Sequence, residues 1–308
     1  MGGKYATETL LADEGGMARA AALLRDGALV AVPTETVYGL AARADSDQAV
    51  ARIYQAKGRP SFNPLIVHVA TMEAARSIAE FSPEAEALAA EHWPGPLTLV
   101  LPRRRDAGLA AAVTAGLETV AIRMPSHPVM RAILAETGLA LAAPSANRSG
   151  FISPTSADHV LTSLGGRIEA VVDGGECRKG LESTIVAVRE DGSLEQLRPG
   201  PLDIALPGLA RGIEAPGQMA SHYAPGKPVR LNVTRAVEDE FAIGFGEVAG
   251  DCSLSVTGDM EEAASRLYAC LHLAAESEKP RIAVAPIPDV GVGRAINDRL
   301  RRAATPPS

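Results

Sequence analysis

Aromatic residues and cysteines are scarce in this chain of 308 residues. Phe, Trp and Tyr supply 4% of the sequence and hydrophobic residues 46%, so any core must be built from aliphatic side chains and alanine. The three cysteines, Cys177, Cys252 and Cys270, are odd in number and show no paired spacing. That pattern argues against disulfides and a zinc site and favours reduced thiols in a cytoplasmic protein.

Long apolar runs and a leader-like N-terminus are also missing. No apolar stretch approaches the roughly 20 residues that a membrane-spanning helix needs. Residues 1–20 are polar and alanine-rich and include Asp13 and Glu14, unlike a signal peptide. The net charge of −7 argues against binding of nucleic acid through a broad basic surface. We therefore expect a soluble, cytoplasmic protein, in which a local basic pocket is still possible.

Several familiar catalytic signatures have no match. The sequence contains no G-x-G-x-x-G, no G-x-x-x-x-G-K-[ST], no G-x-S-x-G and no H-E-x-x-H. A Rossmann dehydrogenase, a P-loop kinase and a serine hydrolase are all disfavoured.

Apolar strands and amphipathic helices alternate through the first two-thirds of the chain. Ser46, Thr71 and Ser82 offer N-cap chemistry, and Pro83 suits the first position of a helix. Apolar spacing predicts helices at 16–26, 127–136 and 156–164, and strands at 28–32, 65–69, 97–101, 120–123, 139–143, 170–172 and 185–188. A turn at 190–193 predicts a hairpin within 182–198. We predict an α/β fold whose twisted main sheet mixes parallel and antiparallel strands.

The length of the chain suggests two domains. Composition changes after Pro199-Gly200-Pro201, where Pro and Gly recur without a sustained period. We place a main domain at 1–205, a linker or lid at 206–227 and a small C-terminal α/β domain at 228–308. That domain is expected to hold strands near 229–233, 241–245 and 282–287 and helices near 260–276 and 294–302.

Hydroxyl, amide and guanidinium groups cluster in five short segments at the edges of predicted strands. Such groups, with turn-forming Pro or Gly, suit a site that holds a polyphosphate beside a small zwitterion. No segment includes a nucleophile with its base, which indicates catalysis by positioning. The segments are Pro33-Thr34-Glu35-Thr36, Lys57-Gly58-Arg59-Pro60 with Asn63-Pro64-Leu65, Thr119-Val120-Ala121-Ile122-Arg123, Pro144-Ser145-Ala146-Asn147 and Glu182-Ser183-Thr184.

Several of these residues also have a purely structural interpretation. Lys57 could complement a helix dipole, and His68, inside a strand, could be a satisfied core residue. Arg123 ends a strand with only Glu118 as an acidic neighbour, so it needs either a structural salt bridge or a ligand carboxylate. Asp173 and Glu182 could orient a magnesium ion, although a turn is the better explanation of Asp173-Gly174-Gly175.

Taken together, the segments resemble those of the threonylcarbamoyl-AMP synthase family, whose catalytic module is called the YrdC domain. The resemblance covers about residues 15–202. The tail resembles the family's long, two-domain form. The matching stretches are residues 33–40, 57–69, 93–101, 119–125, 143–150, 153–155, 172–175, 182–185 and 197–200, with His222-Tyr223-Ala224-Pro225, 258–264 and 295–300 in the tail.

The resemblance implies a YrdC-like sheet with a concave, positively lined cavity, a linker over that cavity and a small Rossmann-like domain. It implies an L-threonylcarbamoyladenylate synthase, a nucleotidyltransferase that combines L-threonine, bicarbonate or CO2, and ATP with Mg²⁺, and releases pyrophosphate. A separate complex would transfer the threonylcarbamoyl group to adenosine in tRNA. The competing hypothesis is a non-catalytic module that binds double-stranded RNA or tRNA.

The resemblance also implies roles for individual residues. Lys57 and Arg59 would offset charge on the leaving pyrophosphate. The threonine site would comprise Thr36, His68, Arg123, Ala143 and Ser183. The ATP site would comprise Arg59, Asn63, Thr119, Ser145, Ser153, Arg198, His222 and Tyr223.

Overall fold

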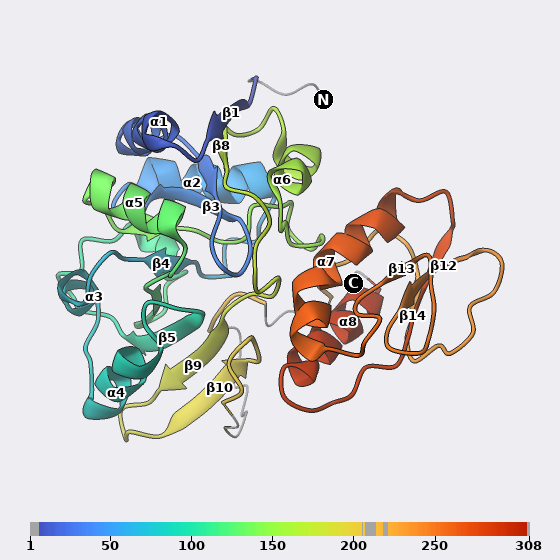
Figure 1. Ribbon diagram of the computed structural model, residues 1–308. Coiled ribbons are helices and arrows are strands. Elements are labelled where there is room, and N and C mark those ends of the chain that lie inside the picture. Colours follow the sequence, from blue (N-terminus) through green and yellow to red (C-terminus); the bar gives the residue numbers. More distant parts are fainter. Residues whose placement is uncertain (1–5, 205, 207–213, 218–220, 307–308) are drawn as a thin grey trace.

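The structure, a computed structural model, describes residues 6–204, 206, 214–217 and 221–306. Figure 1 shows a large α/β body in the N-terminal part of the chain and a smaller one in the C-terminal part. The large body contains a ten-stranded sheet of order β1-β8-β2-β3-β7-β4-β6-β5-β9-β10. The strands are β1 (Glu8–Leu11), β2 (Val30–Val32), β3 (Gly39–Arg43), β4 (Ile66–His68), β5 (Leu97–Pro102), β6 (Thr119–Arg123), β7 (Leu141–Ala142), β8 (Ala170–Asp173), β9 (Thr184–Val188) and β10 (Leu194–Arg198).

The predicted mixed sheet is confirmed. Parallel pairs join β1 to β8, β8 to β2, β4 to β6 and β5 to β9. The other neighbours are antiparallel, including the predicted hairpin of β9 and β10. Two strands, β1 and β3, were not predicted. Strand β3 reads Gly-Leu-Ala-Ala-Arg and has no β-branched residue, so only its burial within the sheet makes it a strand.

Helices α1 (Glu14–Arg25), α2 (Asp47–Lys57), α3 (Met72–Ile78), α4 (Pro83–His92), α5 (Pro128–Thr137) and α6 (Ala157–Leu164), with a 3-10 turn at Ala111–Val113, complete this body. Their starts follow the predicted capping chemistry. The side chains of Ser46, Thr71 and Ser82 accept hydrogen bonds from backbone N–H groups in the first turns of α2, α3 and α4.

Helices cover the two faces of the sheet unequally. Alternate residues of β2 point to opposite faces: Ala31 packs in the core beneath α2, α3, α4 and α6, whereas Val30 and Val32 pack against α1 and α5. The α1 and α5 layer covers only the β1-β8-β2-β3-β7 half of its face. On the other half, Ile66, Val100 and Ile185 pack with Ala215 of the linker segment. This half therefore leaves room for a cavity between the sheet and the linker.

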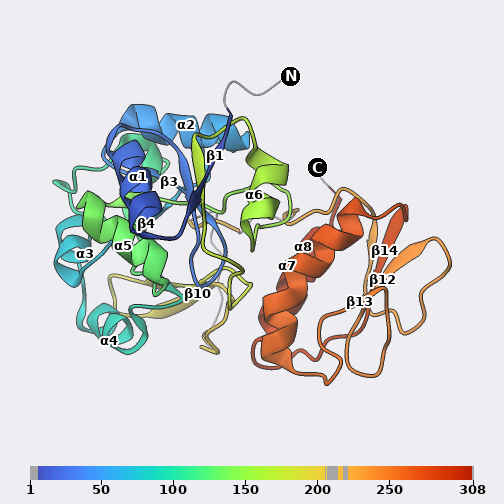
Figure 2. The ribbon, with the colours of Figure 1, turned by 45° about the horizontal axis from the view of Figure 1, so that its top comes forward.

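The C-terminal body is a parallel four-stranded sheet of order β11-β14-β12-β13, which agrees with the predicted α/β class. Its strands are β11 (Val229–Arg230), β12 (Glu240–Gly244), β13 (Cys252–Ser253) and β14 (Arg281–Val284). Helices α7 (Met260–Glu276) and α8 (Gly293–Ala304) lie between this sheet and the large body (Figure 2). Within the described ranges, no helix is long and apolar enough to cross a membrane.

Parts of the predicted linker at 206–227, namely 207–213 and 218–220, lie outside the described residues. The predicted boundaries at 205 and 227 therefore stay predictions. Of the linker, residues 206, 214–217 and 221–227 are described, and several of them approach the large sheet.

Candidate active site

A small buried cavity of about 40 Å³ lies where strand ends, loops and linker converge. Segments far apart in the sequence supply its wall. The lining residues are Thr34, Thr36, Val37, Gly39, Arg59, Ile66, His68, Arg123, Ala143, Pro144, Ser145, Glu182, Ser183, Arg198, Pro216, Gly217, His222 and Tyr223. Ten residues predicted for the site therefore share one pocket: Thr36, Arg59, His68, Arg123, Ala143, Ser145, Ser183, Arg198, His222 and Tyr223.

Sheet register brings one side of the pocket together. His68 pairs with Arg123 across β4 and β6, and Thr98 pairs with Arg123 across β5 and β6. The hydroxyls of Thr98 and Ser183 lie 2.7 Å apart. Because the strands are neighbours, these side chains lie close together without any long loop to carry them. The geometry is set by rigid elements.

Arg123 has a protein partner that its local sequence does not reveal. Its guanidinium donates to the Glu35 carboxylate at 2.6 Å, to the Thr36 hydroxyl at 2.9 Å and to the Gly95 carbonyl at 3.3 Å. Burial alone would raise the pKa of Glu35, but the charge and hydrogen bond of Arg123 outweigh it and lower that pKa. The structural salt bridge that the sequence left open for Arg123 is therefore present, and its partner Glu35 comes from the turn after β2.

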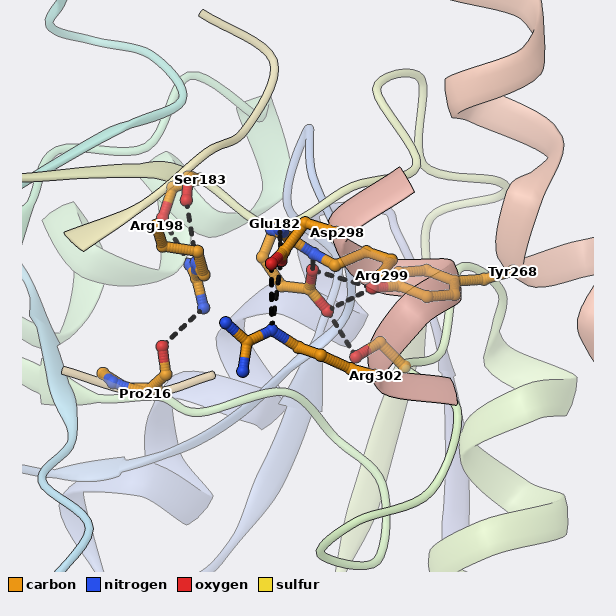
Figure 3. A network of polar contacts seen from close by, with 9 residues as sticks. Glu182, Ser183, Arg198, Pro216, Tyr268, Asp298, Arg299 and Arg302 are labelled. Carbon is orange, nitrogen blue, oxygen red and sulfur yellow. Dashed lines mark hydrogen bonds and ion pairs between the residues drawn. The ribbon is translucent and has the colours of Figure 1, made fainter. Parts of the chain in front are cut away.

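Two further arginines line the pocket, and both are almost fully buried. Arg59 donates to the Asn63 carbonyl at 3.1 Å, the Asn63 amide oxygen at 2.6 Å and the Pro64 carbonyl at 2.8 Å. Burial lowers the pKa of Arg59 to about 10, so it stays a cation at neutral pH. Arg198 donates to the Ser183 carbonyl and hydroxyl, both at 3.0 Å, and to the Pro216 carbonyl of the linker at 3.2 Å (Figure 3).

Small residues let backbone and hydroxyl groups approach the pocket closely. Gly39 bridges to Ser145, and a Cβ on Gly39 would lie 3.3 Å from that of Ala143, so a larger residue would crowd this wall. The Thr34 hydroxyl is 2.8 Å from that of Thr36 and donates to the Val37 carbonyl at 2.6 Å. These contacts orient the Thr36 hydroxyl toward Arg123.

Three buried polar atoms of the pocket have no hydrogen-bond partner among the described residues. They are Nδ1 of His68, Nδ1 of His222 and the hydroxyl of Tyr223. Burial first, and nearby arginine charge after it, lowers the pKa of both histidines to about 3, so both rings are neutral at physiological pH. Buried polar groups are normally satisfied, so these atoms point to a ligand that supplies the missing partners.

Linker residues form the outer wall of the pocket. Pro216, Gly217, His222 and Tyr223 all line it. The backbone N–H of His222 donates to the carbonyl of Arg302 in α8 at 3.3 Å. The hydroxyl of Ser221 donates to the carbonyl of Thr305 at 2.9 Å. The C-terminal body thereby holds this part of the linker over the pocket.

Four predicted site residues do not line the pocket, and three of them support residues that do. Asn63 fixes Arg59, as described above. The Ser153 hydroxyl donates to the Glu182 carboxylate at 2.5 Å. Lys57 donates from Nζ to the carbonyls of Ser145 at 2.6 Å and Asn147 at 2.5 Å. The fourth, Thr119, begins β6 and lies at the opposite end of that strand from Arg123.

The predicted magnesium contacts have other partners. Asp173 accepts the backbone N–H of Gly175 at 3.1 Å, as expected for a turn. Both carboxylate oxygens of Glu182 accept hydrogen bonds from side chains, so neither is left for a metal without breaking a contact. Across the described ranges, no group of three or more His, Cys, Asp or Glu could hold a metal ion. The described residues therefore include no such cluster for a resident metal.

Sequence reasoning missed some members of the pocket. Glu35 lies inside the segment that was singled out for its threonines, so its position was noticed but not its charge. Glu182 was singled out in its polar segment and as a possible magnesium contact but not as an ion-pair partner, and Pro216 and Gly217 were assigned only to the linker. An acidic residue between two hydroxyl residues at a strand end was the available signal for Glu35.

Comparisons with known proteins agree on one family. A family model described as "Telomere recombination" matches residues 22–200, and one described as "Threonylcarbamoyl-AMP synthase, C-terminal domain" matches residues 184–305. The threonylcarbamoyl-AMP synthase of Bacillus subtilis strain 168 is 41% identical, across 97% of this chain and 95% of its own.

Solved structures of the Pyrococcus abyssi protein Sua5 match over nearly the whole length. Its complex with L-threonine superimposes with a TM-score of 0.88 at 36% identity and covers 97% of each chain. A P. abyssi Sua5 variant with a His and the following Tyr both changed to Ala has the same TM-score at 35% identity, covering 97% of this chain and 96% of that one.

Proposed function

The chain belongs to the threonylcarbamoyl-AMP synthase family, and from that premise we propose how its pocket divides between an amino acid and a nucleotide. It is an ATP-using synthase and a nucleotidyltransferase of the two-domain form. The proposed substrates are L-threonine, bicarbonate or CO2, and ATP. The proposed products are L-threonylcarbamoyladenylate and pyrophosphate, made in the cytoplasm for a separate complex that modifies tRNA. Membership of a synthase family weighs against the non-catalytic RNA-binding hypothesis.

The observation that carries the proposal is the composition of the pocket. Three buried arginines, Arg59, Arg123 and Arg198, face the same small space as two neutral histidines. Clustered guanidiniums suit carboxylate and phosphate groups, and neutral imidazoles do not add to the positive charge. One pocket thus offers binding partners for both the amino-acid end and the phosphate end of L-threonylcarbamoyladenylate.

We assign L-threonine to the sheet side, at Thr36, His68, Arg123, Ala143 and Ser183. Arg123 would bind the carboxylate and share its guanidinium with Glu35. The unpartnered Nδ1 of His68, at the end of β4, and the hydroxyl of Ser183, just before β9, line the same pocket and suit the amine and hydroxyl of the substrate. P. abyssi Sua5 binds L-threonine, and its similarity over nearly the whole chain supports this assignment.

We assign the nucleotide to the opposite wall, at Arg59, Ser145, Arg198, His222 and Tyr223. Arg59 and Arg198 would contact phosphates, and the linker pair would reach the nucleotide from outside. Asn63, Lys57 and Ser153 would act as supports, because their polar groups bind wall residues instead of facing the cavity. We leave Thr119 out, because it lies at the far end of β6.

The chemistry then requires positioning and charge stabilisation and no covalent enzyme intermediate. The neutral amine of threonine attacks the carbon of CO2, loses a proton and becomes a carbamate. A carbamate oxygen attacks the α-phosphorus of ATP, and the bond to pyrophosphate breaks in line. Arg59 would offset charge on the departing pyrophosphate, together with the Mg²⁺ that enters bound to ATP. Exclusion of water protects the short-lived carbamate.

The size of the cavity adds a condition. A space of about 40 Å³ holds only a few water molecules, far too little for a nucleoside triphosphate. We infer that the described linker residues Pro216, Gly217, His222 and Tyr223 move outward when the substrates bind.

Release of pyrophosphate from ATP tests the proposal. We expect release to require both L-threonine and bicarbonate, and Arg59→Ala to abolish it. Arg76→Ala is the control, because Arg76 forms an exposed ion pair with Glu86 far from the pocket. Pyrophosphate release that ignores threonine, or an Arg59→Ala variant with normal turnover, would contradict the assignment.

A further inference from the structure

A buried carboxylate joins the two bodies of the protein at the edge of the pocket (Figure 3). Oε1 of Glu182 accepts the Ser153 hydroxyl at 2.5 Å, and the Tyr268 hydroxyl lies 3.0 Å from Oε1 and 2.8 Å from Oε2. Nε of Arg299 donates to Oε2 at 3.0 Å. Glu182 lines the pocket, whereas Tyr268 and Arg299 come from α7 and α8 of the C-terminal body.

Arg299 is a fully buried arginine, with no measurable exposure. Besides Glu182 it contacts Asp298 at 2.9 Å, and its guanidinium carbon lies 5.5 Å from the centre of the Tyr223 ring. Its second terminal nitrogen has no partner among the described residues. One side chain of the C-terminal body thus contacts two residues of the pocket wall, Glu182 and Tyr223.

The contacts continue from Glu182 into the proposed nucleotide wall. Ser183, the next residue, accepts hydrogen bonds from the Arg198 guanidinium through both its carbonyl and its hydroxyl. Arg198 in turn holds the linker through the Pro216 carbonyl. The Tyr223 ring also lies 5.6 Å from that of Tyr268. A shift of Glu182 or Tyr223 would therefore move Arg198 and the linker together.

We propose that Arg299 is a positioning residue for the nucleotide half of the pocket, acting through Glu182 and Tyr223. The inference rests on the proposed function, since it takes the Arg198 and Tyr223 wall as the ATP site. The C-terminal domain then belongs to the catalytic apparatus, because one of its side chains fixes the wall against which the substrate binds.

Electrostatics make this role specific to a cation. Burial alone would raise the pKa of Glu182, but Arg299 first and Arg198 second hold it at about 2. Without Arg299, the carboxylate would be buried with a weaker set of counter-charges, and its pKa would rise toward neutrality. The pocket wall would then change shape, or the Glu182 carboxylate would take up a proton. Either response would disturb Arg198, which the backbone of Ser183 holds.

The experiment compares Arg299→Met, which keeps the apolar stem, with Tyr268→Phe, which removes only the hydroxyl on Glu182. Arg301→Ala is the matched control, because Arg301 is an exposed arginine of the same helix. Each full-length variant is assayed for threonine- and bicarbonate-dependent pyrophosphate release. The assay gives separate KM values for ATP and threonine from pH 6 to pH 8.5.

We expect Arg299→Met to raise the ATP KM about tenfold and Tyr268→Phe about threefold, with smaller changes in the threonine KM. Arg301→Ala should stay within about twofold of the wild type. The ATP KM of Arg299→Met, relative to the wild type, should fall as pH decreases, because protonation of Glu182 removes the negative charge that Arg299 no longer balances. Glu182→Gln combined with Arg299→Met should abolish that pH dependence.

Two outcomes would overturn the inference and leave Arg299 a purely structural residue. The first is that Arg299→Met changes the KM for ATP and the KM for threonine equally. The second is that the ATP KM of Arg299→Met, divided by that of the wild type, does not depend on pH. If Arg299→Met does not fold, Tyr268→Phe decides: an ATP KM equal to that of Arg301→Ala overturns it. A wild-type protein without threonine-dependent activity would instead refute the proposed function, so the two failures are distinguishable.

Discussion

Arg123 and Glu35 form a buried ion pair of 2.6 Å between the end of β6 and the turn after β2. The protein therefore supplies a carboxylate at the place where a ligand carboxylate was expected. Any substrate that binds Arg123 must share it with Glu35. This competition sets how strongly Arg123 can attract an anion.

Glu35→Gln should strengthen threonine binding. The substitution keeps the hydrogen-bonding shape and removes the competing charge, so the threonine KM should fall several-fold while the unliganded protein loses about 1–3 kcal/mol of stability. Thermal unfolding measures the loss of stability, and the threonine dependence of pyrophosphate release measures the KM. Arg123→Ala should raise the threonine KM, and Glu86→Gln, at an exposed pair, serves as control. If Arg123→Ala weakened ATP binding instead, the two subsites would have to be exchanged.

Two stacked histidines make the contact between the bodies sensitive to pH. His159 of α6 and His272 of α7 lie with ring centres 3.8 Å apart at 14°. Burial lowers the pKa of His159, and burial with the neighbouring His159 lowers that of His272 to about 3. Asp158, Glu176 and Glu276 lie near the pair and only partly offset these effects.

Between about pH 3 and 6.5 the unfolded chain binds more protons at His272 than the folded one, and the lowered pKa of His159 acts in the same direction. This contribution to stability is therefore complete above the unfolded pKa and is lost as pH falls below it. His272→Phe keeps the stack but cannot titrate. We expect it to reduce the loss of thermal stability between pH 7 and pH 5, measured by calorimetry. An unchanged slope would show that His68 and His222, whose pKa values are also near 3, account for it.

Lys57→Met should act on the loop and not on the phosphates. The ammonium holds the carbonyls of Ser145 and Asn147, and its loss would leave buried acceptors unpaired at a cost of about 1–3 kcal/mol. We expect a lower midpoint in urea and a higher ATP KM, with kcat largely kept. Lys279→Met is the control, because the half-buried Lys279 donates to the Glu238 carbonyl of the C-terminal body and does not line the pocket. Normal stability with a collapse of kcat would show that Lys57 contacts the reacting groups.

Gly217→Ala tests whether the linker must lie close against Arg198. Gly217 has φ +84°, and a Cβ there would lie 2.9 Å from the Tyr223 hydroxyl and 3.0 Å from Cδ of Arg198. Gly226→Ala is a matched control, because Gly226 has φ +77° with nothing within 4 Å of its added Cβ. Both variants carry backbone strain, but only Gly217→Ala should raise the ATP KM, by about fivefold or more. Equal KM values in the two variants would refute the close contact.

Local signals predicted much of this molecule. Capping hydroxyls at Ser46, Thr71 and Ser82 marked true helix starts, and apolar runs marked most strands. Strand β3 was missed because its alanines and leucine favour a helix when read alone, and burial in the sheet overrides that preference. Strand β1 is largely exposed, so its alternation of apolar and polar residues was weak.

The membership of the site was predictable, but its internal pairing was not. Short motifs and the family resemblance together identified ten residues that share the pocket, most of them near strand ends and two, His222 and Tyr223, in the linker. The partner of Arg123 lies 88 positions away, and no local spacing could reveal it. Lys57 and Asn63 were recognised as polar residues near the site, but their side chains point into the supporting loops. The direction of a side chain depends on tertiary contacts that sequence spacing does not contain.

Glu182 and Arg299 are separated by 117 positions. During synthesis the ribosome therefore releases the strands of the large sheet long before it makes the cation that neutralises this carboxylate. A nascent chain that has completed β10 but not α8 can hold most of the pocket wall and still lack its fixed geometry. The contact between Arg299 and this carboxylate can accordingly form only after the second body has docked.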